Sequence, residues 1–312
     1  MRPNGIYSPG ELRDFVEQDG PKYYPKLLKY VRIKVIEASP TILAPFDKSL
    51  QEEAIKQLTR NIKTKDPNIL NLLPEKFKLT ELLLNSGVSE VKEDVISLRD
   101  GEDIPYGIAV WAAGNGPLPV TLQLVEALSK EEDGQSEAQA IARGRVATDP
   151  WLRAIGGKGD ILAFGDCSCI IAGQLPATAQ VAGQQGEYLA RLLSQNYEFC
   201  PDGDTTKPPM ADPSREKTLS EKISSFAIGA DDIAAPFQFL NLGILAYTGG
   251  GSALAQLQLT PSEQSKLKGK GKIGFGLWRS VYLSKQISWR NRVLVFFDWT
   301  KTQVFGRDIT RL

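Results

Sequence analysis

The sequence predicts an α/β protein of two domains, in which short buried strands alternate with helices. Residues 161–164, Ile-Leu-Ala-Phe, form an unbroken apolar run that ends at Gly165, which is typical of a strand buried on both faces of a parallel sheet. A helical pattern of apolar residues follows over 176–193. With 312 residues and 42% hydrophobic content, the chain is long enough for a large core and for two domains.

The composition excludes several kinds of function. The formal net charge is zero, so no broad positive field attracts nucleic acid. The chain contains no histidine, which excludes a Ser-His-Asp triad, imidazole acid–base catalysis and histidine zinc sites, and we expect no metal. The three cysteines, Cys167, Cys169 and Cys200, form no C-x-x-C motif, which indicates a reducing compartment without a disulfide framework.

Targeting and membrane-spanning patterns are also missing from the sequence. No run of 18 apolar residues is present, so we expect no spanning helix. Residues 1–19 have neither the apolar centre of a signal peptide nor the Arg- and Ser-rich pattern of a transit peptide.

The first third of the chain is expected to begin with a helix over 10–18 and a strand over 31–36, which ends at Glu37. An acidic residue at the end of the second strand of a dinucleotide fold can hold the adenosine ribose 2′-hydroxyl. Taken alone, Glu37 is explained more simply as a solvated strand end. A second helix is expected over 46–60, and two prolines in a polar run predict a loop over 61–79.

The next stretch predicts a series of strands and then a turn of small residues. The expected strands are 82–84, 88–91 and 95–98, with a turn at Asp100-Gly101. Residues 108–111, Ile-Ala-Val-Trp, predict another buried strand, and 112–116 predict a small-residue turn. Such a turn lets a backbone approach a cofactor closely, but small residues at strand ends also serve packing alone.

A carboxylate and a helix start are expected at one sheet edge in the middle of the chain. They come after residues 120–128, which are expected to form a short helix or a connector. Asp166 follows the run at 161–164, so we expect it at the carboxyl end of that strand, where open α/β sheets bind ligands. A carboxylate there can accept hydrogen bonds from the hydroxyls of a sugar or ribitol chain. Pro176 and Thr178 predict a helix start, whose positive end suits a phosphate or an electron-rich heterocycle. An ordinary strand, turn and helix is the alternative.

The last third combines a strand pair with aromatic and basic helices. Residues 200–224 are expected to form a loop, and 236–251 alternate like two strands joined by a glycine turn. Aromatic and basic side chains are interleaved in 276–292, which suits a membrane surface, although a helix that packs in a domain or dimer interface fits equally well. The residues concerned are Trp278, Arg279, Tyr282, Lys285, Ile287, Trp289, Arg290 and Arg292.

The order of these segments resembles one protein family. The segments are Glu37-Ala-Ser, Val110-Trp-Ala-Ala-Gly, Val146-Ala-Thr-Asp-Pro-Trp-Leu-Arg, Ala163-Phe-Gly-Asp-Cys, Leu175-Pro-Ala-Thr-Ala-Gln-Val-Ala-Gly-Gln-Gln and the ending from Asp298 to Leu312. Together they resemble the second half of the type II, or alternative, NADH:quinone oxidoreductases, which are flavoproteins with two dinucleotide-binding domains.

The resemblance implies an incomplete two-dinucleotide-binding-domain, Rossmann-like flavoprotein with a C-terminal α+β membrane and dimer region. Its parts would be residues 1–118 (partial NADH-binding domain), 119–230 (second part of the FAD-binding domain) and 231–312 (membrane association and dimerisation).

Site residues also follow from the resemblance. It assigns FAD to Gly165, Asp166, Ala179 and Gln180, the quinone and flavin edge to Gln180 and Gln184, NADH to Glu37, Ala113 and Gly114, and membrane contacts to Trp278, Tyr282, Trp289, Arg290 and Arg292.

The activity that the resemblance implies is hydride transfer from NADH to FAD and then to a quinone, without proton pumping. The enzyme would be a homodimer at the surface of the mitochondrial inner membrane, with a plastid membrane as the alternative location.

The sequence departs from the family at its glycine loops. Neither of the family's two Gly-x-Gly-x-x-Gly loops is present, so we expect a truncated form without the N-terminal FAD-binding part. A non-catalytic remnant that binds a membrane or a full-length partner is one alternative. Another reductase of the same two-domain class is the second, although the sequence has no redox-active cysteine pair.

Overall fold

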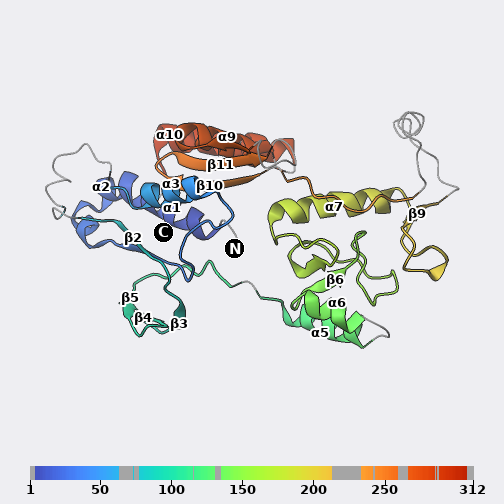
Figure 1. The fold of residues 1–312 in the computed structure, drawn as a ribbon. Helices are drawn as coiled ribbons and strands as arrows, with labels where there is room; N and C mark the ends of the chain where they lie inside the picture. Colours follow the sequence, from blue (N-terminus) through green and yellow to red (C-terminus); the bar gives the residue numbers. More distant parts are fainter. Residues whose placement is uncertain are drawn as a thin grey trace. The chain divides into compact units, whose positions relative to one another are not determined.

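The computed structural model describes residues 4–62, 73, 77–114, 116–130, 135–212, 233–241, 243–258, 266–284, 286 and 288–307. The chain divides into two compact units, each shown in Figure 1. The first unit comprises Met1–Ala113 together with Asn241–Leu312, and the second comprises Gly114–Leu240. The last 72 residues therefore pack with the first 113, although more than 120 residues separate them in the sequence.

The N-terminal part of the first unit is a small α/β layer around a two-stranded parallel sheet. The sheet pairs β1 with β2, and Ile33 lies opposite Thr80. Apolar side chains of the helices and of the strand β1 share one core with Phe77 and Leu79. The elements are α1 (Asn4–Gln18), α2 (Gly20–Tyr23), the 3₁₀ helix η1 (Pro25–Tyr30), β1 (Ile33–Ile36), α3 (Lys48–Leu58) and β2 (Thr80–Leu83).

An antiparallel meander follows, as the alternating pattern predicts. Its strands are β3 (Val88–Val91), β4 (Val95–Leu98) and β5 (Asp103–Pro105), with β4 in the middle. Gly101 in the β4–β5 turn has a φ of 92°, a conformation that glycine adopts without a steric penalty.

The predicted buried strand at 108–111 is wrong. Ile108 is 89% exposed and Trp111 64% exposed, and no described strand pairs with this segment. A short apolar run forms a buried strand only where a neighbouring strand supplies its backbone hydrogen bonds, and here the run lies in the connection from the meander to the second unit.

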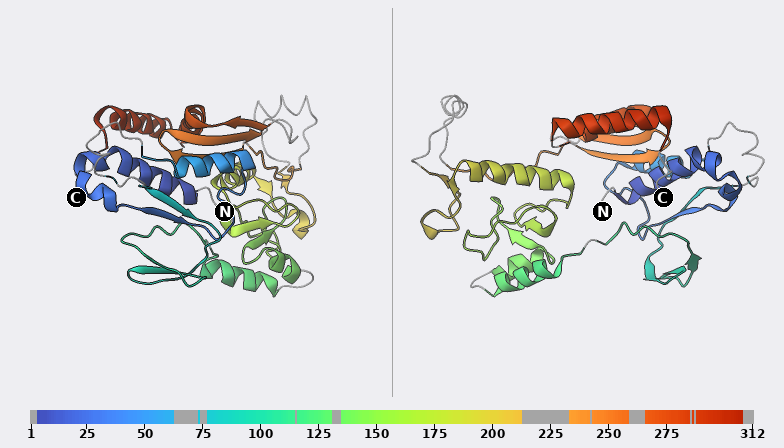
Figure 2. Two further views of the ribbon diagram at one scale, coloured as in Figure 1. Left: turned by 60° about the vertical axis from the view of Figure 1, so that its left-hand side comes forward. Right: turned by 180° about the vertical axis from the view of Figure 1, so that it is seen from behind.

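A three-stranded antiparallel sheet forms the C-terminal part of the first unit. The order is β10 (Ile244–Gly249), β11 (Ser252–Gln258), β12 (Lys266–Gly269). Of the strand pair predicted within 236–251, only β10 lies among the described residues of that range; the glycines at its end form the turn, and the second strand, β11, follows them. The sheet lies between α9 (Gly271–Ser284) on one side and α1 and α3 on the other (Figure 2). Gly274 lets α9 approach β11 closely, because a Cβ there would overlap the Ala253 carbonyl oxygen.

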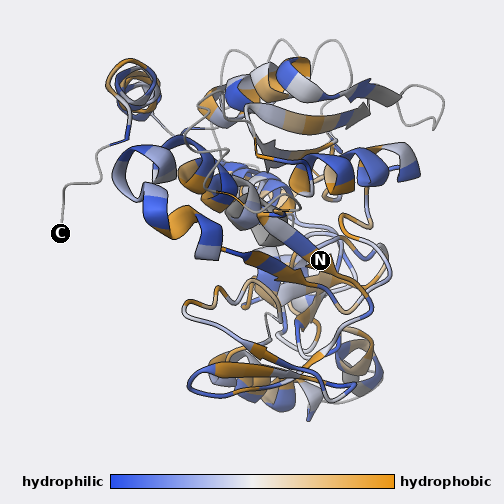
Figure 3. Ribbon diagram, turned by 90° about the vertical axis from the view of Figure 1, so that its left-hand side faces the viewer, coloured by the Kyte–Doolittle hydropathy of each residue, from blue (hydrophilic) through white to orange (hydrophobic). Residues whose placement is uncertain are grey.

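The core of this part joins distant segments. Side chains of α3 and of the loop before it pack against Ala246 of β10 and Leu254 of β11. The last helix, α10 (Trp289–Phe305), follows α9, and Figure 3 shows hydrophobic positions on this helix. None of the helices in the described ranges is long and apolar enough to cross a membrane.

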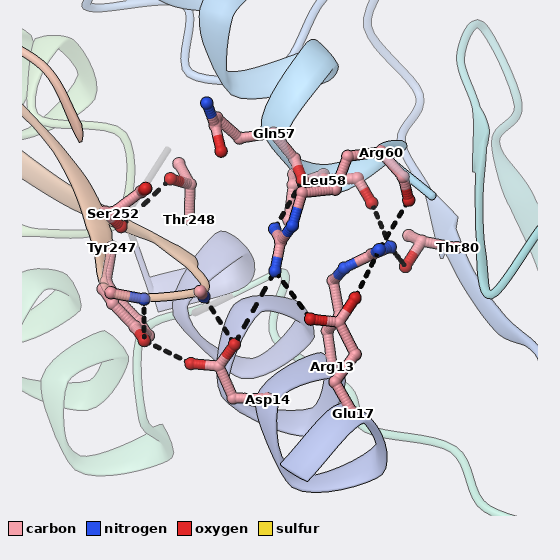
Figure 4. Close-up of polar contacts among 12 residues, drawn as sticks. Arg13, Asp14, Glu17, Gln57, Leu58, Arg60, Thr80, Tyr247, Thr248 and Ser252 are labelled. Carbon is pink, nitrogen blue, oxygen red and sulfur yellow. Dashed lines mark hydrogen bonds and ion pairs between the residues drawn. The ribbon is translucent and has the colours of Figure 1, made fainter. Parts of the chain in front are cut away.

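A buried polar network fixes α1 against α3, β2 and β10 (Figure 4). Arg13 is fully buried and donates to the Leu58 carbonyl at 2.8 Å and to the Thr80 hydroxyl at 3.0 Å. The next residue, Asp14, accepts hydrogen bonds from the Tyr247 hydroxyl and from the Gly250 amide. Burial and the Asp14 carboxylate raise the pKa of Tyr247 well above its usual range, so this phenol stays a hydrogen-bond donor.

The second unit consists of helices and short strands around a parallel pair. The strand β6 pairs with β7, and Val146 lies opposite Ser168. The apolar face of α7 packs on Leu152 and Ile170 to form the main core of the unit. The elements are α5 (Pro119–Ser129), α6 (Gln135–Ile141), β6 (Val146–Thr148), the 3₁₀ helix η2 (Gly165–Cys167), β7 (Ser168–Ile170), α7 (Ala179–Ser194), β8 (Tyr197–Glu198), the 3₁₀ helix η3 (Pro201–Gly203) and β9 (Met210–Ala211).

The predicted strand at 161–164 is wrong, and the strand of this region lies after Asp166 rather than before it. Residues 161–163 pair instead with the nearby chain around Ala154: the Ala154 amide donates to the Ile161 carbonyl, and the Ala163 amide donates to the Leu152 carbonyl. A tight turn at 156–159 makes this local partner available. The buried strand is β7, whose residues pair with β6.

Candidate functional site

The Gly165–Asp166 loop lies beside the N-terminal half of α7. Gly165 has a φ of 76°, and a Cβ at this position would lie 3.4 Å from the Ala182 side chain, so a glycine allows the loop its close approach. Asp166 is exposed on the 3₁₀ turn η2. The structure therefore places these two residues next to the helix that the sequence predicts, although Asp166 precedes a strand instead of ending one.

The start of α7 has the properties of an anion- or ring-binding end. Thr178 is the N-cap, and its hydroxyl oxygen accepts the Val181 amide at 3.3 Å. Ala179, the first helical residue, is exposed. The amides of the first turn and the helix dipole suit a phosphate or an electron-rich ring, and the Asp166 carboxylate suits hydroxyl groups. This set of groups fits the ribitol and phosphate chemistry of FAD.

A residue that the motif analysis missed connects the loop to the helix. Gln185 is buried, and its side-chain oxygen accepts the Gly165 amide at 2.7 Å. The second glutamine of the Gln-Gln pair was the only signal in the sequence. Its role depends on a contact across 20 residues, so spacing alone did not distinguish it from a core amide.

Replacing Gln185 with leucine is expected to loosen this loop. Leucine keeps the buried volume but leaves the Gly165 amide unpaired, which costs about 1–3 kcal/mol. Hydrogen exchange of residues 164–170, followed by mass spectrometry, should accelerate in Gln185→Leu. The exposed Gln123 of α5 provides a matched control, Gln123→Leu, which should leave the rates unchanged. Unchanged exchange in the Gln185 variant would contradict the role of this hydrogen bond.

Two glutamines predicted at the quinone edge bind the protein's own backbone. The Gln184 side chain donates to the Leu240 carbonyl and accepts the Leu240 amide, both at 2.9 Å, as a neighbouring strand would. Gln180 donates to the same carbonyl at 3.4 Å. Tyr188 donates to the Ala235 carbonyl at 2.8 Å, and burial raises the pKa of its phenol above the usual range. These side chains hold the 235–240 segment along α7.

The predicted NADH residues are divided between the two units. Glu37 follows β1, and its carboxylate accepts the Ser39 amide at 2.8 Å. Ala113 ends the N-terminal segment of the first unit, and Gly114 begins the second; both are exposed and outside regular structure. The structure shows Glu37 at a strand end, as predicted, and the grouping of these three residues stays a prediction.

The predicted membrane residues differ in their surroundings. Trp278 is half-buried and stacks on Tyr247 and Tyr282, with ring centroids 5.5 and 5.6 Å apart. Trp289 is 76% exposed, and Arg290 is exposed beside it. Arg292 donates to the Ser284 and Gln286 carbonyls, which joins the start of α10 to the end of α9. Trp278 is therefore largely a packing residue, whereas Trp289 and Arg290 face solvent.

Metal ligands do not gather anywhere in the described ranges: no group of three or more Cys, Asp or Glu side chains there could hold a metal ion. All three cysteines are free.

Comparisons with known proteins agree with these features. Residues 241–308 match the NDH2 C-terminal domain family. The internal alternative NAD(P)H-ubiquinone oxidoreductase A1 of Solanum tuberosum mitochondria is 32% identical over 99% of this chain, which covers 52% of that protein. The external NADH-ubiquinone oxidoreductase 2 of Saccharomyces cerevisiae mitochondria is 32% identical over 98% of this chain, which covers 50% of it.

A solved structure shows the same fold. The NDH2 of Plasmodium falciparum, in complex with NADH, matches 98% of this chain and 65% of that chain, with a TM-score of 0.69 and 19% identity. In fold, the chain is thus a partial Rossmann-like α/β protein. Its sequence makes it a relative of the type II, or alternative, NADH-ubiquinone oxidoreductases, as the motifs predicted, and it spans about half the length of the curated relatives it matches.

Proposed function

We propose that this chain forms part of a FAD-dependent NADH:quinone oxidoreductase of the alternative, non-pumping type. The observation that carries the proposal is the similarity of nearly the whole chain to mitochondrial proteins named for this activity. The reaction would pass a hydride from NADH to FAD and then two electrons to a quinone. The chain spans about half the length of each of these relatives.

FAD supplies the redox chemistry when it is bound, so the task of these residues is to bind and orient. Asp166 is proposed to accept hydrogen bonds from ribitol hydroxyls, and the first turn of α7 at Ala179 and Gln180 to face the flavin ring. Gln185 holds the backbone of Gly165, the residue before Asp166, in place through its hydrogen bond. For a quinone to reach the amides of Gln180 and Gln184, its oxygens must compete with the backbone of Leu240.

Peripheral membrane attachment and dimerisation are part of the same proposal. Large apolar side chains are exposed on the last two helices, and a soluble surface rarely gathers so many. They are Ile273, Tyr282, Trp289, Val293, Leu294, Phe296, Phe297, Val304 and Phe305. The relatives are mitochondrial proteins, which supports an inner-membrane location, with a plastid membrane as the alternative.

The first experiment is flavin retention. The chain is incubated with FAD, gel-filtered and measured by absorbance, and retained flavin would support the proposed site. Asp166→Ala should then release most of the flavin, because the carboxylate loses its bonds to hydroxyls, whereas the exposed Asp160→Ala should retain it. Equal retention by both variants would contradict the role of Asp166.

A non-catalytic remnant is the second candidate, and one observation favours it. Each amide atom of Gln184 already bonds to Leu240, so only the second N–H and the second lone pair of this amide remain for a ligand. A colourless wild-type chain that still binds vesicles or a longer relative would support this candidate.

A further inference from the structure

A cavity of about 370 Å³ lies between α9 and α10 in the first unit. Its apolar walls are Leu283, Phe296 and Trp299, and its polar walls include Arg279 and Gln303. The cavity thus combines rings, an aliphatic side chain and a cation within two helices that follow each other in the sequence.

Arg279 is a half-buried cation on α9. Its guanidinium carbon lies 4.4 Å from the centroid of the Trp299 ring and 5.3 Å from that of Phe275. Among the described residues, no carboxylate or hydrogen-bond acceptor pairs with it. Stacking on the rings fixes the plane of the guanidinium and leaves its five N–H donors available at the edges.

The other polar groups of the cavity show which donors remain for a ligand. The hydroxyls of Ser280 and Thr300 donate to carbonyls of their own helices, at 2.9 and 2.8 Å, so they are already used. Gln303 is exposed on α10, and its amide makes no hydrogen bond with a described residue. Arg279 and Gln303 are therefore the free donors, and both suit a phosphate oxygen.

The surface next to the cavity is apolar. Phe296 lines the cavity and is 55% exposed. The exposed Val293 lies three residues before it, and the exposed Phe297 lies four residues after Val293, so Val293 neighbours both rings on α10. The acidic residue of this helix, Asp298, lies about half a helical turn from Phe296, Val293 and Thr300 on a wheel of about 100° per residue. A ligand with an anionic head and an apolar tail matches this arrangement of charge and surface.

We propose that the cavity between α9 and α10 binds the phosphate of an anionic phospholipid at Arg279 and Gln303, with an acyl chain over Phe296, Val293 and Phe297. This inference rests on the proposed function in one respect: the lipid comes from the membrane to which the chain is proposed to attach. It adds a headgroup site to a surface that otherwise attracts lipid through scattered exposed residues.

The first test compares two arginines in vesicle flotation. The 312-residue wild type, Arg279→Gln and Arg290→Gln are floated with phosphatidylcholine vesicles and with vesicles that also contain phosphatidylglycerol. Loss of one exposed cation weakens binding to an anionic surface about fivefold, which is the expectation for Arg290→Gln. Arg279→Gln should weaken it about tenfold or more, because charge-assisted hydrogen bonds are lost as well. Equal losses in the two variants would overturn the headgroup site while membrane binding stands.

The second test removes the membrane. A short-chain phosphatidylglycerol, used below its micelle concentration, should change the tryptophan fluorescence of wild type and of Arg290→Gln, and Arg279→Gln should respond only at about tenfold higher concentration. Short-chain phosphatidylcholine and inorganic phosphate should bind more weakly. If either binds as tightly as the anionic lipid, the proposed ligand is wrong.

A third variant keeps the proposal testable if Arg279→Gln does not fold. Gln303→Leu alters an exposed residue, so it should fold as wild type does, and it should weaken the short-chain lipid about three- to tenfold through the lost amide donor. Unchanged affinity in Gln303→Leu, together with equal losses at the two arginines, would contradict the site. Wild type that binds the short-chain lipid but no vesicle would contradict the membrane proposal and leave the site intact.

Discussion

Replacing Arg13 with methionine is expected to lower the free energy of unfolding of the first unit by about 3–5 kcal/mol. Arg13 is fully buried, and its guanidinium binds the Leu58 carbonyl, the Thr80 hydroxyl and the Glu17 carboxylate. Burial lowers the pKa of Arg13, and the Glu17 carboxylate opposes this shift, so the cation is retained at a desolvation cost that its partners offset. Methionine removes the cation and leaves those partners without a donor.

Urea unfolding followed by hydrogen exchange of α1, α3 and β2 measures this effect for the first unit alone. The exposed Arg99 in the meander gives the control, because Arg99→Met should change the unfolding free energy by less than about 0.5 kcal/mol. A loss of under about 1 kcal/mol in Arg13→Met would show that methionine packing replaces the network, as occurs for some buried ion pairs.

Local patterns in the sequence were sufficient to predict most elements that carry their own signals. The helix α7 has a Thr178 cap and apolar residues at helical spacing, and its start is where the sequence places it. The strands β3 and β4 alternate and flank turn residues, and they are also as predicted. In each case the information lies within one short segment.

Short apolar runs were the weak point, because they do not specify their partner. Residues 161–163 pair with the chain around Ala154, and 108–111 pair with no described strand. Both runs satisfy the pattern of a buried strand, and only the presence of a neighbouring strand decides between the outcomes.

Long-range packing was equally invisible in the sequence. Gly10 of α1 approaches the end of β10 so closely that a Cβ would lie 2.9 Å from the Gly249 nitrogen. This contact brings the C-terminal sheet into the first unit, yet it joins residues more than 200 positions apart. Small residues at two distant sites carry no mutual signal in one sequence.

In the candidate site, too, local features were predicted from the sequence and long-range contacts were not. The motif around Gly165 and Asp166 and the start of α7 were predicted from local sequence, and the structure places them side by side. The hydrogen bonds of Gln184 with Leu240 span 56 residues, so the sequence could not show that this amide is occupied. Residue types can therefore indicate a ligand site before it is known which of their atoms are free.

Arg153 gives the second large prediction: Arg153→Met should lower the free energy of unfolding of the second unit by about 3–5 kcal/mol. The side chain is 3% exposed, and its Nε donates to the Asp149 carboxylate at 2.6 Å. Its terminal nitrogens donate to the carbonyls of Phe199, Thr205 and Lys207 at 2.6–2.9 Å. One guanidinium thus closes the loop between β8 and β9 onto the chain that follows β6.

The loop at 199–207 should respond most strongly, because its carbonyls have no other donor of this kind once Arg153 is lost. Hydrogen exchange in this segment should accelerate in Arg153→Met, and Arg153→Lys should recover only part of the stability, since one ammonium cannot match the fork of a guanidinium. The exposed Arg191→Met on α7 is the control and should leave the segment protected. If Arg153→Lys is as stable as wild type, positive charge alone holds the loop, and the carbonyl contacts contribute little.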